Sequence, residues 1–365
     1  MPAAARLLTR ERARDVVAAA ATGDGGGRVG HVGLEIELFP DGPVPDAVLP
    51  GGSVVTFEPG GQVELSGPCL PSADAAIACM EADLAALAAS GVGLSAVGMR
   101  DEPGPRVLDN PRYAAMEAYF DGLGPEGRRM MRDTASLQVN VDGGDGRWQA
   151  LHRAGPALAA AFANSPGGDG CPSRRLALWD TMDPTRCAPV GGTLPGGWVD
   201  YAMAARVMFI RVAPSRYVAL DGRMTLADWV DGGHPLGFPD ADDVAYHLTT
   251  LFPPVRPRGW LEVRFLDALP SPWWQAAVAA VCALGGQDGS EGPGGVDVSG
   301  LWREAARVGL ALPALGDAAS RCLRDAVDRL EGEGSSQAPL VREFAERFTW
   351  RRRCPADETR VGAWG

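Results

Sequence analysis

GLEIELF, residues 33–39, alternates apolar and acidic side chains and decides the fold. Successive side chains of a β-strand point to opposite faces, so the aliphatic side chains would share one face and Glu35 and Glu37 the other. The aliphatic face belongs in a core, which leaves two carboxylates side by side on the opposite face. A strand with one apolar and one polar face is typical of an antiparallel sheet.

Three further segments repeat this alternation: FEPGGQVELSG (57–67), SLQVNVD (136–142) and WLEVRFLD (260–267). Taken singly, the alternation of each strand is most simply explained by a polar face that is exposed to solvent. Compared with one another, their polar faces carry mainly Glu, Gln and Asn, whose hard oxygen donors suit Mg²⁺. The acidic members would repel one another unless cations lay among them. These members are Glu35, Glu37, Glu58, Glu64 and Glu262.

The rest of the chain places helices between and after these strands. Helices are predicted over 9–22, 72–90, 111–121, 147–164 and 272–286, strands over 93–99, 202–212 and 216–220, and loops with short elements over 165–200. Alternating strands interleaved with helices favour an α+β fold, in which an antiparallel sheet has helices on one face. We expect one domain over 1–365, with its core motifs in 30–285 and a helical C-terminal part over 299–350.

The composition excludes several classes of function. The 365 residues carry a formal charge of −12, which disfavours nucleic acid as a partner. All 34 basic side chains are arginines, so neither a lysine Schiff base nor a Walker A lysine is possible. No apolar run approaches the roughly 20 residues that span a bilayer. Seven cysteines without a CxxC pair, and an N-terminus without an apolar stretch, predict a cytoplasmic protein with reduced thiols.

A glycine-rich stretch over 25–30 formally matches GxGxxG. A predicted helix precedes it and a predicted strand follows it, whereas a dinucleotide-binding loop needs the reverse order. We interpret it as a loop. Cys69 follows the ELSG string and is interpreted as a structural residue.

In their order and spacing, the four strand segments resemble the glutamate–cysteine ligase family, in the branch shared by plant and bacterial enzymes. NPRYAAMEAYF (110–120), LWDTMDPTRC (178–187) and WVDYAMAARVMFI (198–210) add to the likeness. The resemblance spans roughly residues 30–285. FEPGGQVELSG is its most specific string. The absence of Lys and the richness in Ala, Gly and Arg look actinobacterial, and within the family the chain most resembles the ligase that supplies ergothioneine synthesis.

The resemblance implies a glutamine-synthetase-like fold, a curved antiparallel sheet that forms a funnel backed by helices. It also implies the reaction. ATP phosphorylates the γ-carboxylate of glutamate, and the amine of cysteine then displaces phosphate to give γ-glutamylcysteine. Phosphoryl transfer between two anions needs cations that neutralise charge, and the acidic residues would bind these cations. ATP would be the co-substrate, Mg²⁺ the cofactor, and L-glutamate and L-cysteine the substrates.

Carried over by motif, six residues resemble Mg²⁺ ligands: Glu35, Glu37, Glu58, Glu64, Gln138 and Glu262. Gln138 stands where some distant members have a ligand His, so its amide oxygen or a water would serve. Arg264 and Glu64 are the candidate catalytic residues. Arg264, Arg132, Asn140 and Tyr113 are the candidate substrate-binding residues.

Two other functions stay open at this point. The first is a carboxylate–amine ligase that joins glutamate to another amine. It stays open because the motifs do not define the pocket for the acceptor amine. Alternatively, the chain would be a catalytically silent relative that binds metabolites, although all five glutamates are present. We expect a monomer with no nucleic-acid or membrane partner.

Overall fold

The computed structural model describes residues 8–23, 30–44, 48–284 and 298–359. Its centre is an antiparallel sheet with strand order β2-β3-β1-β5-β9-β8, in which β4 also pairs with β1. Together with its helices, this sheet confirms the predicted α+β class. The strands are β1 (Val32–Pro40), β2 (Val54–Phe57), β3 (Val63–Ser66), β4 (Leu94–Ser95), β5 (Ser136–Asp142), β8 (Val255–Pro257) and β9 (Trp260–Asp267).

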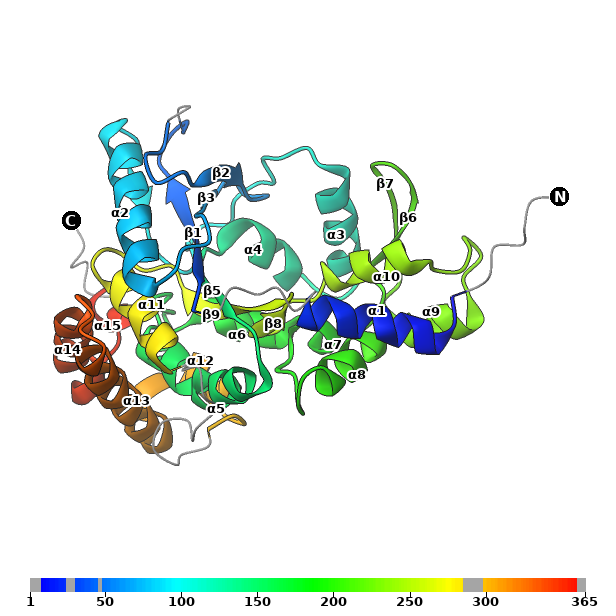
Figure 1. The fold of residues 1–365 in the computed structure, drawn as a ribbon. Helices are drawn as coiled ribbons and strands as arrows, with labels where there is room; N and C mark the ends of the chain where they lie inside the picture. Colours follow the sequence, from blue (N-terminus) through cyan, green and yellow to red (C-terminus); the bar gives the residue numbers. More distant parts are fainter. Residues whose placement is uncertain (1–7, 24–29, 45–47, 285–297, 360–365) are drawn as a thin grey trace.

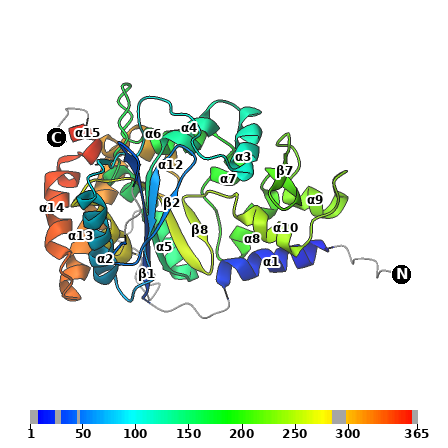
Figure 2. The same cartoon turned by 90° about the horizontal axis from the view of Figure 1, so that it is seen from above.

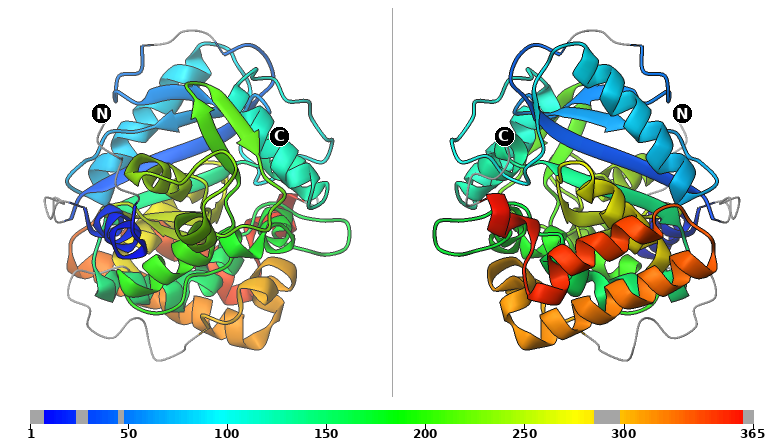
Figure 3. Two further views of the ribbon diagram at one scale, coloured as in Figure 1. Left: turned by 90° about the vertical axis from the view of Figure 1, so that its right-hand side faces the viewer. Right: turned by 90° about the vertical axis from the view of Figure 1, so that its left-hand side faces the viewer.

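The apolar face of the sheet carries the main core, as the alternation predicts. Leu34, Ile36, Leu65 and Val139 are each at most 2% exposed and belong to one hydrophobic cluster. Three helices pack on this side: α2 (Ala73–Ala89), α5 (Asp145–Ala161) and α11 (Trp273–Leu284). An outer layer of α13 (Pro313–Gly332) and α14 (Ala338–Arg347) packs on α5 and α11, in orange and red in the right-hand view of Figure 3.

On the other side of the sheet lies a second group of helices, seen to the right of the strands in Figures 1 and 2. A small hairpin of β6 (Phe209–Ala213) and β7 (Arg216–Ala219) belongs to this group. Its helices are α1 (Arg10–Thr22), α3 (Pro111–Asp121), α4 (Glu126–Asp133), α6 (Arg174–Thr181), α7 (Pro184–Cys187), α8 (Gly196–Ala204), α9 (Leu226–Gly232) and α10 (Ala241–Leu248). The sheet therefore lies between two helical groups rather than carrying helices on one face alone.

A buried ion pair joins several elements of this second group. Arg186 and Asp183 are at most 1% exposed, and the Arg186 Nε donates to Asp183 at 2.9 Å. Arg186 also donates to the backbone oxygens of Thr250, at 2.7 Å, and Arg206, at 2.6 Å. Tyr119 of α3 donates its hydroxyl to Asp183. One guanidinium thus connects α3 and α7 with the segments before β6 and β8.

Local sequence signals explain most helix boundaries. The Ser72 side chain accepts from the amide of Ala75 and the Thr9 side chain from that of Arg12, so both act as the predicted N-caps. The prediction of strand over 202–212 was wrong in its first part, because α8 continues to Ala204. Trp198, Val199, Ala202 and Met203 are buried at helical spacing, and a short apolar run does not separate helix from strand.

Of two other predictions, one holds and one needs correction. The interval 165–200 holds short elements between loops, namely α6, α7 and the start of α8, whereas the strand predicted over 93–99 is reduced to β4. Short elements complete the C-terminal part: α12 (Trp302–Arg307), η2 (Gly309–Ala311), η3 (Thr349–Arg351) and α15 (Pro355–Thr359). Within the described ranges, no helix is long and apolar enough to cross a membrane. The glycine pattern at 25–30 lies outside the described residues except for Gly30.

Candidate active site

The register of the sheet brings the predicted acidic side chains together. Glu37 on β1 lies opposite Glu64 on β3, and Glu35 lies opposite Gln138 on β5. All six predicted metal ligands line one cavity of about 380 Å³, together with Arg264 and Tyr113. Their polar faces therefore line a cavity rather than a flat solvent-exposed surface.

Glu37 is held by hydrogen bonds from β5. The amide of Ser136 donates to its Oε2 at 2.7 Å, and the Gln138 side chain donates to its Oε1 at 3.2 Å. Burial, and then the charge of Glu64, raise the pKa of Glu37 to about 7. The site thus holds a carboxyl group whose ionised form has too little compensation from the protein alone.

A tight turn presents Glu58 to the cavity. The amide of Glu58 donates to the Gln62 carbonyl at 2.9 Å, and the amide of Gly61 donates to the Glu58 carbonyl at 2.8 Å. Gly61 has a φ of +85°, which favours glycine. Burial, followed by repulsion from Glu37 and Glu64, raises the pKa of Glu58 to about 8.

Tyr113 lines the same part of the cavity. Burial first, and then the neighbouring charge of Glu58, raise the pKa of the Tyr113 hydroxyl to about 12. The phenol is therefore neutral at physiological pH and carries a proton to donate.

Glu262 lies in the opposite electrostatic surroundings. Its carboxylate is 1% exposed and accepts from Arg256 at 3.0 Å, with Arg264 at 3.1 Å and Arg258 at 3.7 Å as further ion-pair partners. Burial alone would raise the pKa of Glu262, but the arginines outweigh it and hold the value at about 2. The cavity thus has a cationic side, facing the uncompensated acids on β1 and β3.

Sequence reasoning missed most of this cationic side. Arg112, Arg175, Arg256 and Arg258 line the cavity, and none of them is among the site residues predicted from the sequence. The signal was present in RPRGWLEVR, residues 256–264, where arginines alternate before the strand turns back. Arg112 donates to the backbone and side-chain oxygens of Thr249, each at 3.1 Å, which fixes α3 at the mouth of the cavity.

Gln138 and Arg264 meet at an irregularity of the sheet. The register of β5 against β9 shifts between Leu137 and Val139, so that Arg264 and Phe265 of β9 lie across from the single residue Gln138. Such bulges often redirect side chains beside active sites. The Gln138 Oε1 accepts from the Arg264 Nη1 at 2.6 Å. This amide oxygen was predicted to bind Mg²⁺, and in this structure it accepts a hydrogen bond from the guanidinium instead.

The structure does not bring two of the predicted substrate-binding residues to the cavity wall. Arg132 belongs to α4 and donates to the Glu117 carboxylate at 2.8 Å, away from the lining residues. Asn140 donates to Glu35 at 3.0 Å and accepts from the Trp260 indole at 3.0 Å, which places it behind Glu35. Both side chains therefore support their neighbours rather than reach a ligand in this arrangement.

The donor set fits a divalent cation in chemistry. Glu37 and Glu58 are half-buried, mutually repelling carboxylates, and Glu35 also has a pKa raised by burial and then by Glu262. Hard oxygen donors of this kind are the ligands of Mg²⁺, which keeps several positions for water and phosphate. No three carboxylate, imidazole or thiol groups of the described residues already converge on one point as a complete ligand set.

Comparisons with known proteins agree with the motifs. A family model described as glutamate–cysteine ligase family 2 matches residues 35–343. The chain is 39% identical over 375 residues to a glutamate–cysteine ligase EgtA of Mycolicibacterium smegmatis, covering 91% of this chain and 87% of the relative. It is 38% identical over 379 residues to the EgtA of Mycobacterium tuberculosis H37Rv, covering 91% and 86%.

A chloroplastic glutamate–cysteine ligase of Nicotiana tabacum is more distant. It is 32% identical over 262 residues, covering 64% of this chain and 48% of the plant protein.

Proposed function

Since the chain belongs to glutamate–cysteine ligase family 2, we propose that it joins the γ-carboxyl group of glutamate to the amine of cysteine. The ligase family implies ATP as co-substrate, and ergothioneine synthesis is the route the product would enter. One observation carries the proposal beyond family membership. The acidic residues of three strand motifs, Gln138 of the fourth and a cluster of arginines line one cavity of about 380 Å³.

The proposed reaction has two steps. The γ-carboxylate oxygen of glutamate attacks the terminal phosphorus of ATP, and ADP leaves with its electron pair. The cysteine amine then attacks the acyl carbon of γ-glutamyl phosphate, loses a proton, and inorganic phosphate leaves. Neither step needs a covalent bond to the protein, so the lack of a nucleophile beside a base in these motifs is compatible with it.

The residues divide by charge into two roles. Arg264 and the arginines beside it would bind the anionic oxygens of phosphate or carboxylate, since a guanidinium offers paired donors. Glu35, Glu37, Glu58, Glu64, Glu262 and Gln138 would hold Mg²⁺. Bound Mg²⁺ would neutralise charge on the phosphate oxygens. Tyr113, neutral in this site, would donate a hydrogen bond to a substrate oxygen, and Glu64 would take part in catalysis through the cation it holds.

The two arginine partners of Glu262 bear on its proposed role. Its oxygens accept from Arg256 and lie beside Arg264 in this structure. Cation binding at Glu262 would therefore weaken at least one of these contacts and free a guanidinium for an incoming anion. Ligand binding and release of Arg264 would then be coupled.

The open antiparallel sheet matches what a glutamine-synthetase-like funnel requires, and we propose that architecture for the chain. The family model covers 35–343, which supports one catalytic domain. None of the seven cysteines, all of which lie in the described ranges, forms a disulfide, in keeping with action in the cytoplasm.

An omission series tests the activity. ADP release is measured with Mg²⁺, ATP, glutamate and cysteine, each left out in turn, and the product mass is recorded. We expect ADP only with all four and the mass of γ-glutamylcysteine. Serine and 2-aminobutyrate, which replace the thiol by hydroxyl and methyl, serve as matched acceptors. Faster turnover with another amine would contradict the assignment of cysteine as the acceptor. If no ADP is released with glutamate and any of the amines, a catalytically silent, metabolite-binding relative would be favoured.

A further inference from the structure

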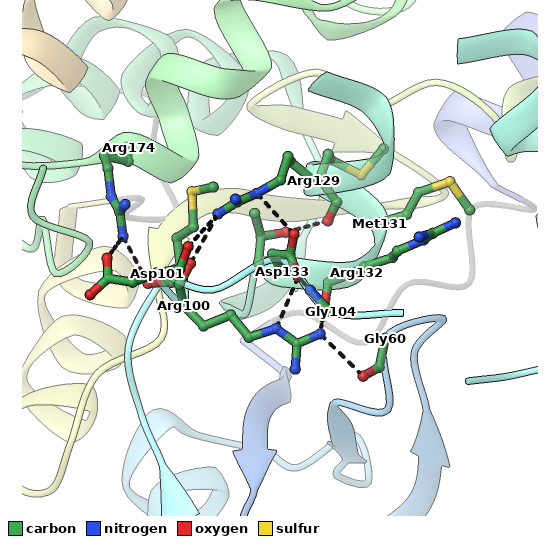
Figure 4. Close-up of polar contacts among 12 residues, drawn as sticks. Gly60, Arg100, Asp101, Gly104, Arg129, Met131, Arg132, Asp133 and Arg174 are labelled. Atoms are coloured by element: carbon green, nitrogen blue, oxygen red, sulfur yellow. Dashed lines mark hydrogen bonds and ion pairs between the residues drawn. The ribbon is translucent and has the colours of Figure 1, made fainter. Parts of the chain in front are cut away.

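A strap over residues 99–108 holds the turn that carries Glu58, and its contacts are drawn in Figure 4. We infer that Arg100 and Asp133 act as a positioning pair that fixes the Pro59–Gly61 turn, and with it Glu58, against the sheet. The inference rests on the proposed role of Glu58 as a metal ligand. Neither residue lines the cavity, so both would act through the turn.

Asp133 is the buried end of this pair. Its side chain is 1% exposed and lies at the last position of α4. Its Oδ1 accepts from the Arg100 Nε at 2.9 Å and from the Gly104 amide at 2.7 Å, and its Oδ2 pairs with the Arg129 Nε at 2.9 Å. A single carboxylate thus binds the start and the middle of the strap to the helix that precedes β5.

Arg100 carries this anchoring on to the turn. Its Nη2 donates to the Arg132 carbonyl at 2.7 Å and reaches the Gly60 carbonyl at 3.5 Å. Gly60 itself lies directly on the helix end, because a Cβ there would come within 2.0 Å of the Arg132 oxygen. The guanidinium therefore spans the point where the turn and α4 touch.

The far end of the strap holds the turn from a second direction. The amide of Val107 donates to the Pro59 carbonyl at 2.7 Å. On the sheet side, the Gln62 side chain donates to the Thr134 carbonyl at 2.8 Å. The turn is thus fixed at Pro59, Gly60 and Gln62, three positions that follow Glu58 in the chain.

A purely structural ion pair would be the simpler interpretation. That interpretation accounts for the Arg100–Asp133 contact but not for the reach of the Arg100 Nη2, which contacts both the Arg132 carbonyl of α4 and the Gly60 carbonyl of the turn. Arg174 provides the contrast. It pairs with Asp101 on the same strap at 2.6 Å and has no recorded contact with the turn or with Asp133. Figure 4 shows Arg174 on the far side of the strap from Gly60.

Removing residues that orient metal ligands typically weakens metal affinity by 10- to 100-fold. We therefore expect Arg100→Met to raise the dissociation constant for Mn²⁺, used as a spectroscopic probe for Mg²⁺, by about 10-fold. Arg174→Met is the matched control and should leave the constant unchanged. Arg100→Lys keeps the charge but not the forked donors, and should fall between the two. Electron paramagnetic resonance of free Mn²⁺ gives the constants without turnover.

Hydrogen–deuterium exchange separates this inference from the metal assignment. In metal-free protein, Arg100→Met should speed exchange in a peptide covering 57–63, while Arg174→Met should not. If wild-type protein binds no Mn²⁺, the metal role of Glu58 falls, and exchange still decides whether Arg100 positions the turn. Equal exchange at 57–63 in the two variants would overturn the inference. If the wild-type protein binds Mn²⁺, equal Mn²⁺ dissociation constants for Arg100→Met and Arg174→Met would also overturn it. Asp133→Asn, if it folds, should reproduce Arg100→Met.

Discussion

Replacing Glu58 by Gln should make the metal-free protein more stable at alkaline pH while abolishing its activity. The folded-state pKa of Glu58 is about 8, against an ordinary value of 4.5. Between these values the folded protein holds a proton that the unfolded chain has lost, so the stability falls as the pH rises. Gln cannot ionise, and the variant escapes this loss.

The magnitude follows from the same two values. At about 1.36 kcal/mol per pKa unit, the interval from 4.5 to about 8 sets a ceiling of about 4 kcal/mol at pH 8. Glu58 keeps some contact with water and repels Glu37 and Glu64, which relax when it is neutralised, so we expect about half the ceiling. The stabilisation of Glu58→Gln over wild type should shrink below about 1 kcal/mol at pH 5, because that pH is only slightly above the pKa of the unfolded chain.

The assay is urea unfolding followed by tryptophan fluorescence in EDTA, at pH 5 and pH 8. Glu262→Gln is the matched control, because its parent carboxylate has a pKa of about 2 and compensates three arginines. That variant should lose stability at both pH values. A Glu58→Gln protein no more stable than wild type at pH 8, or equally stabilised at both, would refute the reasoning.

Three other substitutions give distinct expectations. Glu64→Ala should lower kcat by orders of magnitude with an unchanged circular dichroism spectrum, and wild-type turnover would remove its metal assignment. Arg264→Lys should impair kcat and KM, since an ammonium group lacks the paired donors; unchanged constants would mean that Arg264 only balances charge. Arg186→Met should lower the free energy of unfolding by about 3 to 5 kcal/mol, because Asp183 keeps a buried charge without its main partner; a calorimetric loss under about 1 kcal/mol would contradict this.

The strand faces of the site could be predicted because alternation of period two is a local property. Glu35, Glu37 and Glu64 follow from their own strands, and the aliphatic residues between them have only one core to enter. The register that sets Glu37 opposite Glu64 then brings separate motifs into contact. Resemblance supplied the chemistry that the alternation left open.

Other parts of the site depend on contacts between distant segments. Arg132 precedes β5 and was grouped with that strand, but it is helical and bound by Glu117, 15 residues earlier. Strand alternation does not indicate which helix faces pack around a cavity. Arg112 and Arg175, which lie on helices, therefore could not be predicted as lining residues. The pairing of Gln138 with Arg264 follows from a bulge, which a regular strand pattern does not encode.

The cationic side of the cavity is made of guanidinium groups only, and this restricts how the site could be modified. Amine-directed reagents and enzymatic acylation act on lysine, so neither can neutralise Arg256, Arg258 or Arg264. Dicarbonyl reagents such as phenylglyoxal react with guanidinium and would address this wall directly. Guanidinium also stays protonated through the whole range in which proteins remain folded. Any change of net charge in the pocket must therefore come from its carboxyl groups or from what they bind.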